Sequence, residues 1–357
     1  MTATETLIVR TTNWLGDTVM ALPALRELRR LRPAARLVVA ARAGVAGFYR
    51  WAPEVDEVIT LPPEAGRTRR RAFLGGCREI RRRRPSLYVC LPNSFESALM
   101  GRVAGVPERV GYRTEGRGFL LTHGAAVPTE LHRRHQVYYY LHLLHAVGLS
   151  PVDYLRDPEF KPDLRLRRTP AMEAVSRRFF EAEGIGADGP VLGVHAGAFY
   201  GSAKRWFPER FAAFIRELRS DLPLTVVLFG SPAEQPLADA IAATVGGGRL
   251  HNLCGRTTLD ELVPLIGSCH LFVSNDSGPM HVAAAFQIPQ LALFGSTDPV
   301  ATGPFSPRAV VVKKPVECSP CFLRECPLDL RCFKAITVDE VVRRGRELIY
   351  REYSSDR

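Results

Sequence analysis

The feature that most constrains this chain is a repeated alternation between short apolar runs and amphipathic segments of helical length. In the first half, the apolar runs of strand length are Leu7–Val9, Leu37–Ala40, Val55–Thr60 and Leu87–Leu91. The segment from about Asp17 to Leu31 is amphipathic and ends before Pro33, as a helix would. Because strands separated by helices pair in parallel, the alternation predicts an α/β fold with doubly wound sheets.

The same alternation resumes beyond residues 150–170, a stretch rich in proline and charge that we interpret as a linker. The apolar runs of the second half are Val191–His195, Thr225–Phe229, Leu271–Ser274 and Gln290–Phe294. A chain of 357 residues is long enough for two domains. We therefore expect domains at residues 1–165 and 166–335, followed by a last helix within residues 336–357. No apolar run approaches the length of a membrane span.

Positive charge is concentrated in the first half. Residues 1–168 carry 28 Lys and Arg against 16 Asp and Glu, whereas residues 169–357 carry 20 against 21. The densest basic run comprises Arg67, Arg69, Arg70, Arg71, Arg78, Arg81, Arg82, Arg83 and Arg84. Such a run favours a polyanion, whether nucleic acid, phosphorylated glycolipid or anionic membrane, but a merely solvated basic face has the same composition. Residues 1–10 lack a secretory signal pattern, so we expect a cytoplasmic chain with reduced cysteines.

A polar turn between an apolar run and an alanine-rich run is the strongest candidate for a binding site. Asp276, Ser277 and Gly278 follow the run that ends at Ser274, and the pattern predicts a strand, a turn and a helix. Backbone N–H groups at such a helix start bind anions such as phosphate. His281 lies one helical turn further on, on the side of Ser277. The alternative is that Asp276 or Ser277 only caps the helix.

Three other apolar runs also end in polar turns that contain glycine. After the first run, Gly16 would permit a tight turn, and Asp17 would serve either as a general base or as a helix cap. After His195, the adjacent cations Lys204 and Arg205 suit a departing diphosphate, whereas His195 itself is interpreted as a packed histidine.

The third of these turns carries Ser231 and Glu234. Glu234 suits the two hydroxyls of a ribose, as acidic residues do in dinucleotide folds, but a residue in the first turn of a helix would look the same. Both interpretations stay open from the residues alone.

Four cysteines, Cys318, Cys321, Cys326 and Cys332, lie within fifteen residues of each other. Thiolates at short spacing hold zinc or an iron–sulfur cluster, but these spacings match no standard paired pattern, so reduced structural cysteines are favoured. The chain has neither a Gly-x-Ser-x-Gly elbow nor a Gly-x4-Gly-Lys-Ser/Thr loop, which argues against a nucleophilic hydrolase and a P-loop NTPase.

Taken in order, these motifs resemble the lipopolysaccharide heptosyltransferases of glycosyltransferase family 9, and within them the heptosyltransferase II group. The resemblance rests on four stretches, Trp14–Asp17, Leu91–Leu99, Ala203–Trp206 and Asn275–Ala285. It implies a GT-B architecture, in which two Rossmann-like domains face a central cleft and the last helix crosses back to the first domain. The N-terminal domain would bind the acceptor and the C-terminal domain the nucleotide sugar.

The activity that this resemblance implies is inverting transfer of heptose from ADP-L-glycero-D-manno-heptose to the inner-core heptose on Kdo-lipid A. Asp17 would be the base, and Lys204 the second catalytic residue. The implied donor-binding residues are Gly16, Ala198, Arg205, Ser231, Glu234, Thr257, Asp276, Ser277, Gly278 and His281. The implied acceptor-binding residues are Asn93, Ser94 and Arg113. No cofactor or metal would be required beyond the ADP-heptose donor, and the four cysteines remain a secondary candidate for zinc or iron–sulfur.

An anionic glycolipid acceptor would explain why the first half of the chain is basic. We expect a monomer that binds the inner face of the cytoplasmic membrane peripherally, through electrostatic contact, and that has no nucleic-acid partner. One alternative is a nucleic-acid-binding protein that uses the basic run, although no known reading motif accompanies that run. A second alternative is a GT-B enzyme for another nucleotide sugar, including an epimerase that would act on the donor alone.

Overall fold

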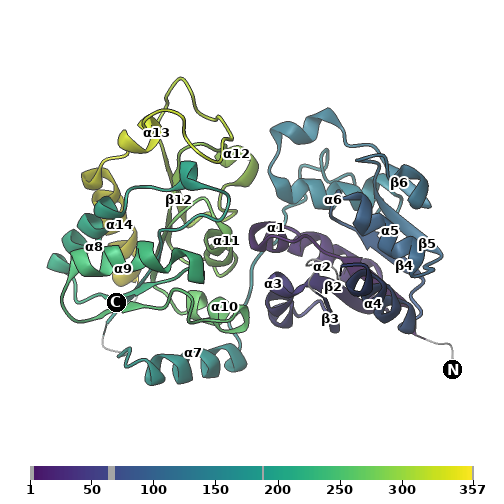
Figure 1. Ribbon diagram of the computed structural model, residues 1–357, viewed down its shortest axis with the longest axis horizontal. Helices are drawn as coiled ribbons and strands as arrows, with labels where there is room; N and C mark the ends of the chain where they lie inside the picture. Colours follow the sequence, from purple (N-terminus) through teal and green to yellow (C-terminus); the bar gives the residue numbers. More distant parts are fainter. Residues whose placement is uncertain (1–3, 63–68, 187–188, 356–357) are drawn as a thin grey trace. The chain divides into compact units, whose positions relative to one another are not determined.

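The computed structural model describes residues 4–62, 69–186 and 189–355, so Arg67 of the basic run lies outside the described residues. The chain divides into two compact units, Met1–Leu164 and Arg165–Arg357. Each unit is built on one six-stranded sheet in which every strand pair is parallel, with helices on both faces (Figure 1). The predicted α/β class with doubly wound sheets is confirmed.

The first unit has the strand order β3-β2-β1-β4-β5-β6. Its strands are β1 (Thr6–Arg10), β2 (Arg36–Arg42), β3 (Glu57–Leu61), β4 (Leu87–Cys90), β5 (Glu108–Tyr112) and β6 (His123–Ala125). Its helices are α1 (Leu15–Met20), α2 (Leu22–Leu31), α3 (Ala43–Ala46), α4 (Arg69–Arg82), α5 (Phe95–Val103) and α6 (Gln136–Ala146).

The second unit repeats this topology with the order β12-β11-β10-β7-β8-β9. Its strands are β7 (Val191–His195), β8 (Thr225–Leu228), β9 (Leu250–Asn252), β10 (Leu271–Asn275), β11 (Gln290–Phe294) and β12 (Ala309–Lys313). Its helices are α7 (Pro170–Ala182), α8 (Pro208–Asp221), α9 (Gln235–Val245), α10 (Leu259–Gly267), α11 (Gly278–Ala285), α12 (Pro299–Thr302), α13 (Arg331–Lys334) and α14 (Val338–Ser355).

The strand order determines where each unit can hold a ligand. In both sheets the first strand lies at the centre, the next two extend to one side, and the fourth returns to pair with the first on its other side. The connections after these two central strands therefore diverge to opposite faces and leave a crevice at their carboxyl ends. In the first unit these are the loops after β1 and β4, and in the second unit the loops after β7 and β10.

The helix expected over Asp17–Leu31 is two helices, α1 and α2, joined at Ala21. Pro23 stands in the first turn of α2, where its missing N–H costs no hydrogen bond. In the middle of a continuous helix the same proline would remove one bond and collide with the preceding turn. The proline therefore restarts the helix, and the prediction of one unbroken helix is wrong.

The last helix, α14, packs on the second unit, where Val341, Val342, Leu348 and Ile349 join the apolar core. Its amphipathic face explains why it was recognised as a helix, since the apolar residues recur at helical spacing. Its predicted return to the first domain stays a prediction.

A glycine on the central strand β7 of the second sheet leaves no room for a larger side chain. A Cβ atom on Gly193 would lie 2.6 Å from Cδ2 of Phe272 and 2.7 Å from Sγ of Cys269. We expect Gly193→Ala to lower the free energy of unfolding of the second unit by about 1–3 kcal/mol, the usual cost of overpacking a core. Urea unfolding followed by circular dichroism would measure it.

Gly248→Ala is the matched control, because a Cβ atom on Gly248 would meet nothing within 4 Å. Its free energy of unfolding should stay within about 0.5 kcal/mol of the parent value. Equal midpoints for both variants would show that β7 tolerates a larger side chain and would contradict the packing argument.

Candidate active site

The turn after β1 brings Asp17 to a buried tyrosine. The N-cap residue of α1 is Trp14, so Asp17 lies in the first turn and is not the capping residue, and Gly16 lies within the helix rather than in a tight turn. The Tyr140 hydroxyl donates to Oδ1 of Asp17 at 2.9 Å. Burial, followed by the neighbouring carboxylate, raises the pKa of Tyr140 well above its ordinary value. Tyr140 is therefore a permanent donor to Asp17.

The turn after β4 carries two of the predicted acceptor-binding residues. Asn93 is exposed, and its Oδ1 accepts from the hydroxyls of Tyr139 at 2.9 Å and Thr114 at 3.3 Å. Ser94 caps α5, since its hydroxyl accepts from the N–H of Ser97 at 3.4 Å. These contacts hold the turn in one shape at the carboxyl edge of the first sheet.

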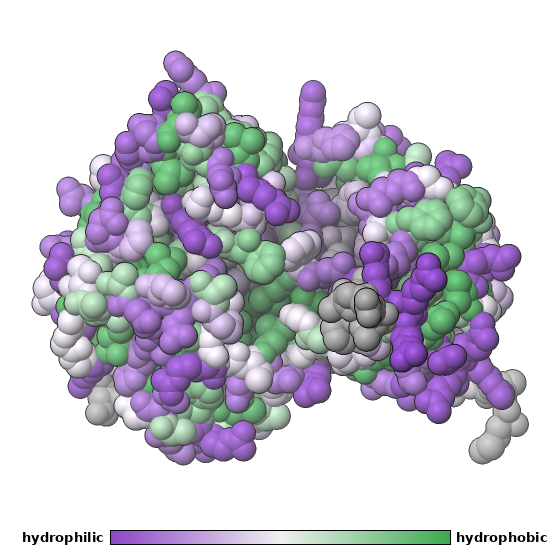
Figure 2. Space-filling model, viewed as in Figure 1, coloured by the Kyte–Doolittle hydropathy of each residue, from purple (hydrophilic) through white to green (hydrophobic). Residues whose placement is uncertain are grey.

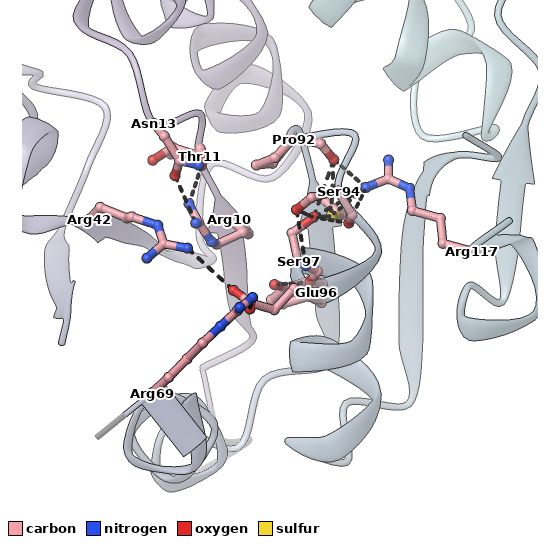
Figure 3. A network of polar contacts seen from close by, with 12 residues as sticks. Arg10, Thr11, Asn13, Arg42, Arg69, Pro92, Ser94, Glu96, Ser97 and Arg117 are labelled. Atoms are coloured by element: carbon pink, nitrogen blue, oxygen red, sulfur yellow. Dashed lines mark hydrogen bonds and ion pairs between the residues drawn. The ribbon is translucent and has the colours of Figure 1, made fainter. Parts of the chain in front are cut away.

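A buried arginine holds this turn in place through hydrogen bonds to its carbonyl groups. Arg117 is fully buried, and its Nη1 donates to the carbonyls of Pro92 and Ser94 (Figure 3). Its Nε donates to the carbonyl of Tyr112 at 2.9 Å. Its Nη2 is buried without a partner. Arg113, the arginine named from the sequence, instead lies exposed at the end of β5. Arg117 was missed because a buried arginine and a surface arginine have the same sequence signal in a basic loop.

Further arginines gather at the carboxyl edge of the first sheet. Glu96 lies between Arg42 at 3.3 Å and Arg69 at 2.7 Å, while Arg10 donates to Oδ1 of Asn13 at 2.9 Å (Figure 3). One carboxylate between two guanidinium groups leaves net positive charge beside the Asp17 turn. This edge is therefore electrostatically suited to an anionic ligand.

In the second unit, Lys204 and Asp276 form the central ion pair of the site. Lys204 ends a short 3₁₀ turn after β7, and its Nζ lies 2.6 Å from Oδ2 of Asp276, which follows β10. The Thr297 hydroxyl donates to the same oxygen at 2.7 Å. Asp276 is only 5% exposed, and its Oδ2 holds Lys204 in place, whereas the N-cap position of α11 belongs to Ser277.

The start of α11 is left open by its own residues. Ser277 stands at the N-cap position but makes no side-chain capping bond, and Gly278 begins the helix. The first N–H groups of a helix have no partner within it, so an uncapped start presents them to a ligand. His281 lies buried one turn along α11. The alternative that Asp276 or Ser277 is only a cap is thus not supported.

Glu234 serves two purposes at the turn after β8. Its Oε2 accepts from the N–H and the hydroxyl of Ser231, both at 2.8 Å, which closes a capping box. Its Oε1 is buried without a partner, and Glu234 is one of the residues around a small, mostly apolar pocket that also includes Gly197, Phe229 and Cys254. Burial by itself would raise the pKa of Glu234, but His195 and Ser231 outweigh it and lower the pKa to about 2. Glu234 is therefore ionised, with one oxygen free for a hydroxyl donor.

Asn275, which the sequence analysis did not single out, ties these loops together. Its amide donates to the carbonyls of Ala196 at 2.7 Å and Gly197 at 3.3 Å, and its Oδ1 accepts from the N–H of Trp206 at 3.0 Å. Buried amides with this many bonds are costly to replace. Asn275 thus joins the end of β10 to the loop after β7.

The remaining donor-side candidates flank this core. Ala198 is fully buried, and its carbonyl accepts from Nη2 of Arg205 at 3.2 Å, so Arg205 braces the loop after β7. Thr257 is half-buried in the loop between β9 and α10. The structure therefore brings Ala198 and Arg205 next to the Lys204 turn. Thr257, in contrast, lies on a separate loop.

Three of the four cysteines lie between β12 and α13, and Cys332 lies in α13. All are free thiols, and within the described residues no group of three or more His, Cys, Asp or Glu is arranged to hold a metal ion. Structural zinc requires four ligands closed around it. The loop instead braces the Lys204 turn, because the carbonyl of Arg324 accepts from the N–H of Ala203 at 3.0 Å.

Comparison with known proteins agrees with this geometry. Residues 77–331 match the model of glycosyltransferase family 9 (heptosyltransferase). The chain is 33% identical to lipopolysaccharide heptosyltransferase 2 of Escherichia coli K12, over 84% of this chain and 86% of that protein. It is 31% identical to lipooligosaccharide heptosyltransferase 2 of Haemophilus influenzae, with the same coverage of both chains.

A solved structure extends the likeness to nearly the whole chain. The structure of E. coli ADP-heptose lps heptosyltransferase II superposes with a TM-score of 0.84 at 29% identity, and covers 98% of this chain and 99% of that one. The predicted GT-B fold and the predicted resemblance to heptosyltransferase II are both confirmed. The chain therefore belongs to glycosyltransferase family 9, the heptosyltransferases.

Proposed function

We propose that this glycosyltransferase moves heptose from ADP-L-glycero-D-manno-heptose to the inner-core heptose on Kdo-lipid A, with inversion at the anomeric carbon. The observation that carries the proposal is the edge of the second sheet, where an uncapped helix start, Lys204 and the free oxygen of Glu234 follow three neighbouring strands. Amides and a cation match a diphosphate, and a buried carboxylate oxygen matches ribose hydroxyls.

In the proposed reaction, Asp17 takes the proton of the acceptor hydroxyl as its oxygen bonds to the anomeric carbon of the donor. The bond from that carbon to the diphosphate oxygen breaks at the opposite face, which inverts the configuration, and ADP leaves with the electron pair. Lys204 and the amides at the start of α11 stabilise the charge that grows on the diphosphate. Asp276 holds Lys204 ready for this role, and Tyr140 orients Asp17.

We also propose that the first unit rests on an anionic membrane. On α4, Arg70, Arg71 and Arg78 are exposed, and the exposed rings of Phe95 and Phe119 contact each other at 6.0 Å between centroids. Hydrophobic and hydrophilic patches lie next to each other on the visible face of this unit, at right in Figure 2. In the described parts of the chain, no helix is long and apolar enough to span a bilayer. Basic and apolar groups together suit peripheral binding.

The direct test is incubation of the protein with ADP-heptose, with and without heptosyl-Kdo-lipid A, followed by ADP release and lipid mass. ADP release only with the lipid, together with one added heptose, is the expected result. Conversion of the donor without the lipid would favour an epimerase, and no reaction would point to another donor sugar.

Replacing Asp17 by Asn should remove the base while keeping the shape of the side chain. We expect kcat to fall by about 10²–10⁴-fold, the usual contribution of a general base. The dissociation constant for ADP should change by less than about twofold, because Asp17 acts on the acceptor hydroxyl in the proposed reaction and does not bind ADP. A tenfold change would need the loss of about 1.4 kcal/mol of contact. A comparable loss of ADP binding would give Asp17 a structural role instead.

Tyr140→Phe tests how Asp17 is positioned. Losing a hydrogen bond to a carboxylate favours its protonated form. The acidic limb of the kcat/KM profile should therefore move to higher pH, with a loss of about tenfold or more near its midpoint, since bonds to charged groups contribute about 1.5–3 kcal/mol. An unchanged profile would show that the Tyr140 contact does not tune the base.

Glu234→Gln should weaken ADP binding about tenfold or more, because the free oxygen of a buried carboxylate is lost as an acceptor. Glu261→Gln is a close control: Glu261 closes the same capping box with the N–H and hydroxyl of Thr258, both at 2.8 Å, at the start of α10. Isothermal titration should find ADP affinity unchanged in the control. Equal losses in both variants would assign the effect to capping.

Replacing Arg70, Arg71 and Arg78 by glutamate tests the membrane contact. The free energy of binding to vesicles of anionic phospholipid, measured by sedimentation at low salt, should become less favourable by about 1 kcal/mol per residue. ADP affinity should stay unchanged, because these residues belong to the first unit. Undiminished vesicle binding would leave the basic face of α4 as an ordinary solvated surface.

A further inference from the structure

His195, interpreted from the sequence as a packed histidine, joins two parts of the second unit that the proposed function treats separately. It is the last residue of β7 and is only 4% exposed. Its Nδ1 lies 3.1 Å from the Ser277 hydroxyl, and its Nε2 lies 3.6 Å from Oε2 of Glu234. Both ring nitrogens therefore face polar groups inside the protein.

The sheet topology explains why one ring can reach both groups. β7 pairs with β10 on one side and with β8 on the other. Ser277 follows β10, and Glu234 follows β8, so the end of β7 lies between them. A histidine at this position spans the distance between the proposed diphosphate loop and the proposed ribose carboxylate.

Glu234 is held tightly on its side of His195. A Cβ atom on Gly197 would come within 1.8 Å of Oε1, so the carboxylate lies directly against the backbone after β7. With Ser231 bound to Oε2 and His195 beside it, Glu234 has little freedom to turn. Its buried Oε1 is consequently held in one orientation.

Ser277 is held in the same way on the other side of His195. A serine at an N-cap usually bonds an N–H of its own helix, but the Ser277 hydroxyl faces His195 instead. The ring can orient both neighbours at once only with a hydrogen on each nitrogen: Nε2–H then points to the Glu234 carboxylate, and Nδ1–H donates to Ser277, whose own hydrogen is free to donate to a ligand oxygen. When Nδ1 lacks a proton, Ser277 must donate to it and has no hydrogen left for the ligand.

We propose that His195 is a positioning residue of the donor site, which orients the Ser277 hydroxyl toward the diphosphate and the Glu234 carboxylate toward the ribose. The inference rests on the proposed function, because it deepens the same donor site. His195 touches neither reacting atom and acts through its two neighbours. It couples recognition of the sugar of the nucleotide to recognition of its phosphates.

Two conservative substitutions separate the contact of His195 with Ser277 from its contact with Glu234. The amide of His195→Asn reaches the position of Nδ1 and keeps a partner for Ser277, whereas the amide of His195→Gln reaches the position of Nε2 and keeps a partner for Glu234. ADP and adenosine are the two probes, since adenosine has the ribose but no diphosphate. Thermal melts would establish that both variants fold.

We expect His195→Gln to weaken ADP binding about tenfold while adenosine binding stays within about twofold of the parent, because Ser277 loses the partner that orients its hydroxyl toward the diphosphate. His195→Asn should weaken both probes, because the ribose carboxylate loses its partner. His251→Asn, a half-buried histidine on β9, is the control that should change neither.

Binding of both probes within twofold in both variants, or equal losses of both probes in both variants, would overturn the proposal and leave His195 as a packing residue. A parent protein that does not bind ADP would instead overturn the proposed donor site itself. A parent protein that binds ADP but transfers no heptose would contradict the proposed function while leaving the role of His195 intact.

Discussion

The pairing of β7 with β10 at the centre of the second sheet brings the Lys204 turn next to the start of α11. These strands are far apart in the sequence, yet their register puts Ser274 opposite His195. The loops that follow them are therefore neighbours, and Asn275 locks them together through the carbonyls of Ala196 and Gly197. The pairing of β1 with β4 acts in the same way in the first unit, where the turns that carry Asp17 and Asn93 follow neighbouring strands.

Each carboxylate of the candidate site has hydrogen-bonding or charged partners of its own. Asp276 is shared by Lys204 and Thr297, Glu234 is stabilised by Ser231 and His195, and Asp17 accepts from Tyr140. A buried carboxylate without such partners would take up a proton rather than stay charged. Glu234 is thus kept ionised by His195 and Ser231, and the direction of each of the three carboxylates is fixed by its partners. Preorganised charge of this kind stabilises a transition state without rearrangement during the reaction.

The same principle distinguishes residues that the sequence revealed from those it did not. Asp17, Lys204, Glu234 and Asp276 were found because each is a charged residue in a turn after an apolar run. Tyr140 was missed because it lies in a helix rich in apolar and aromatic residues, rather than in a glycine-containing turn. His195 was recognised, but its partners follow two other strands, and Arg117 was hidden among many arginines in a basic half. Nothing local separates these residues from ordinary core or surface positions.

What the sequence determined by itself is the class of fold, the turns that carry the chemistry and the family, because hydrophobic periodicity and short ordered motifs are local properties. Strand order, the break between α1 and α2, and the contacts of Asn275 and His195 were decided only in the tertiary structure. Parallel strands leave the same pattern in the sequence whatever their order in the sheet. Only the pairing of strands distant in the chain decides which turns become neighbours, and therefore which side chains can act together.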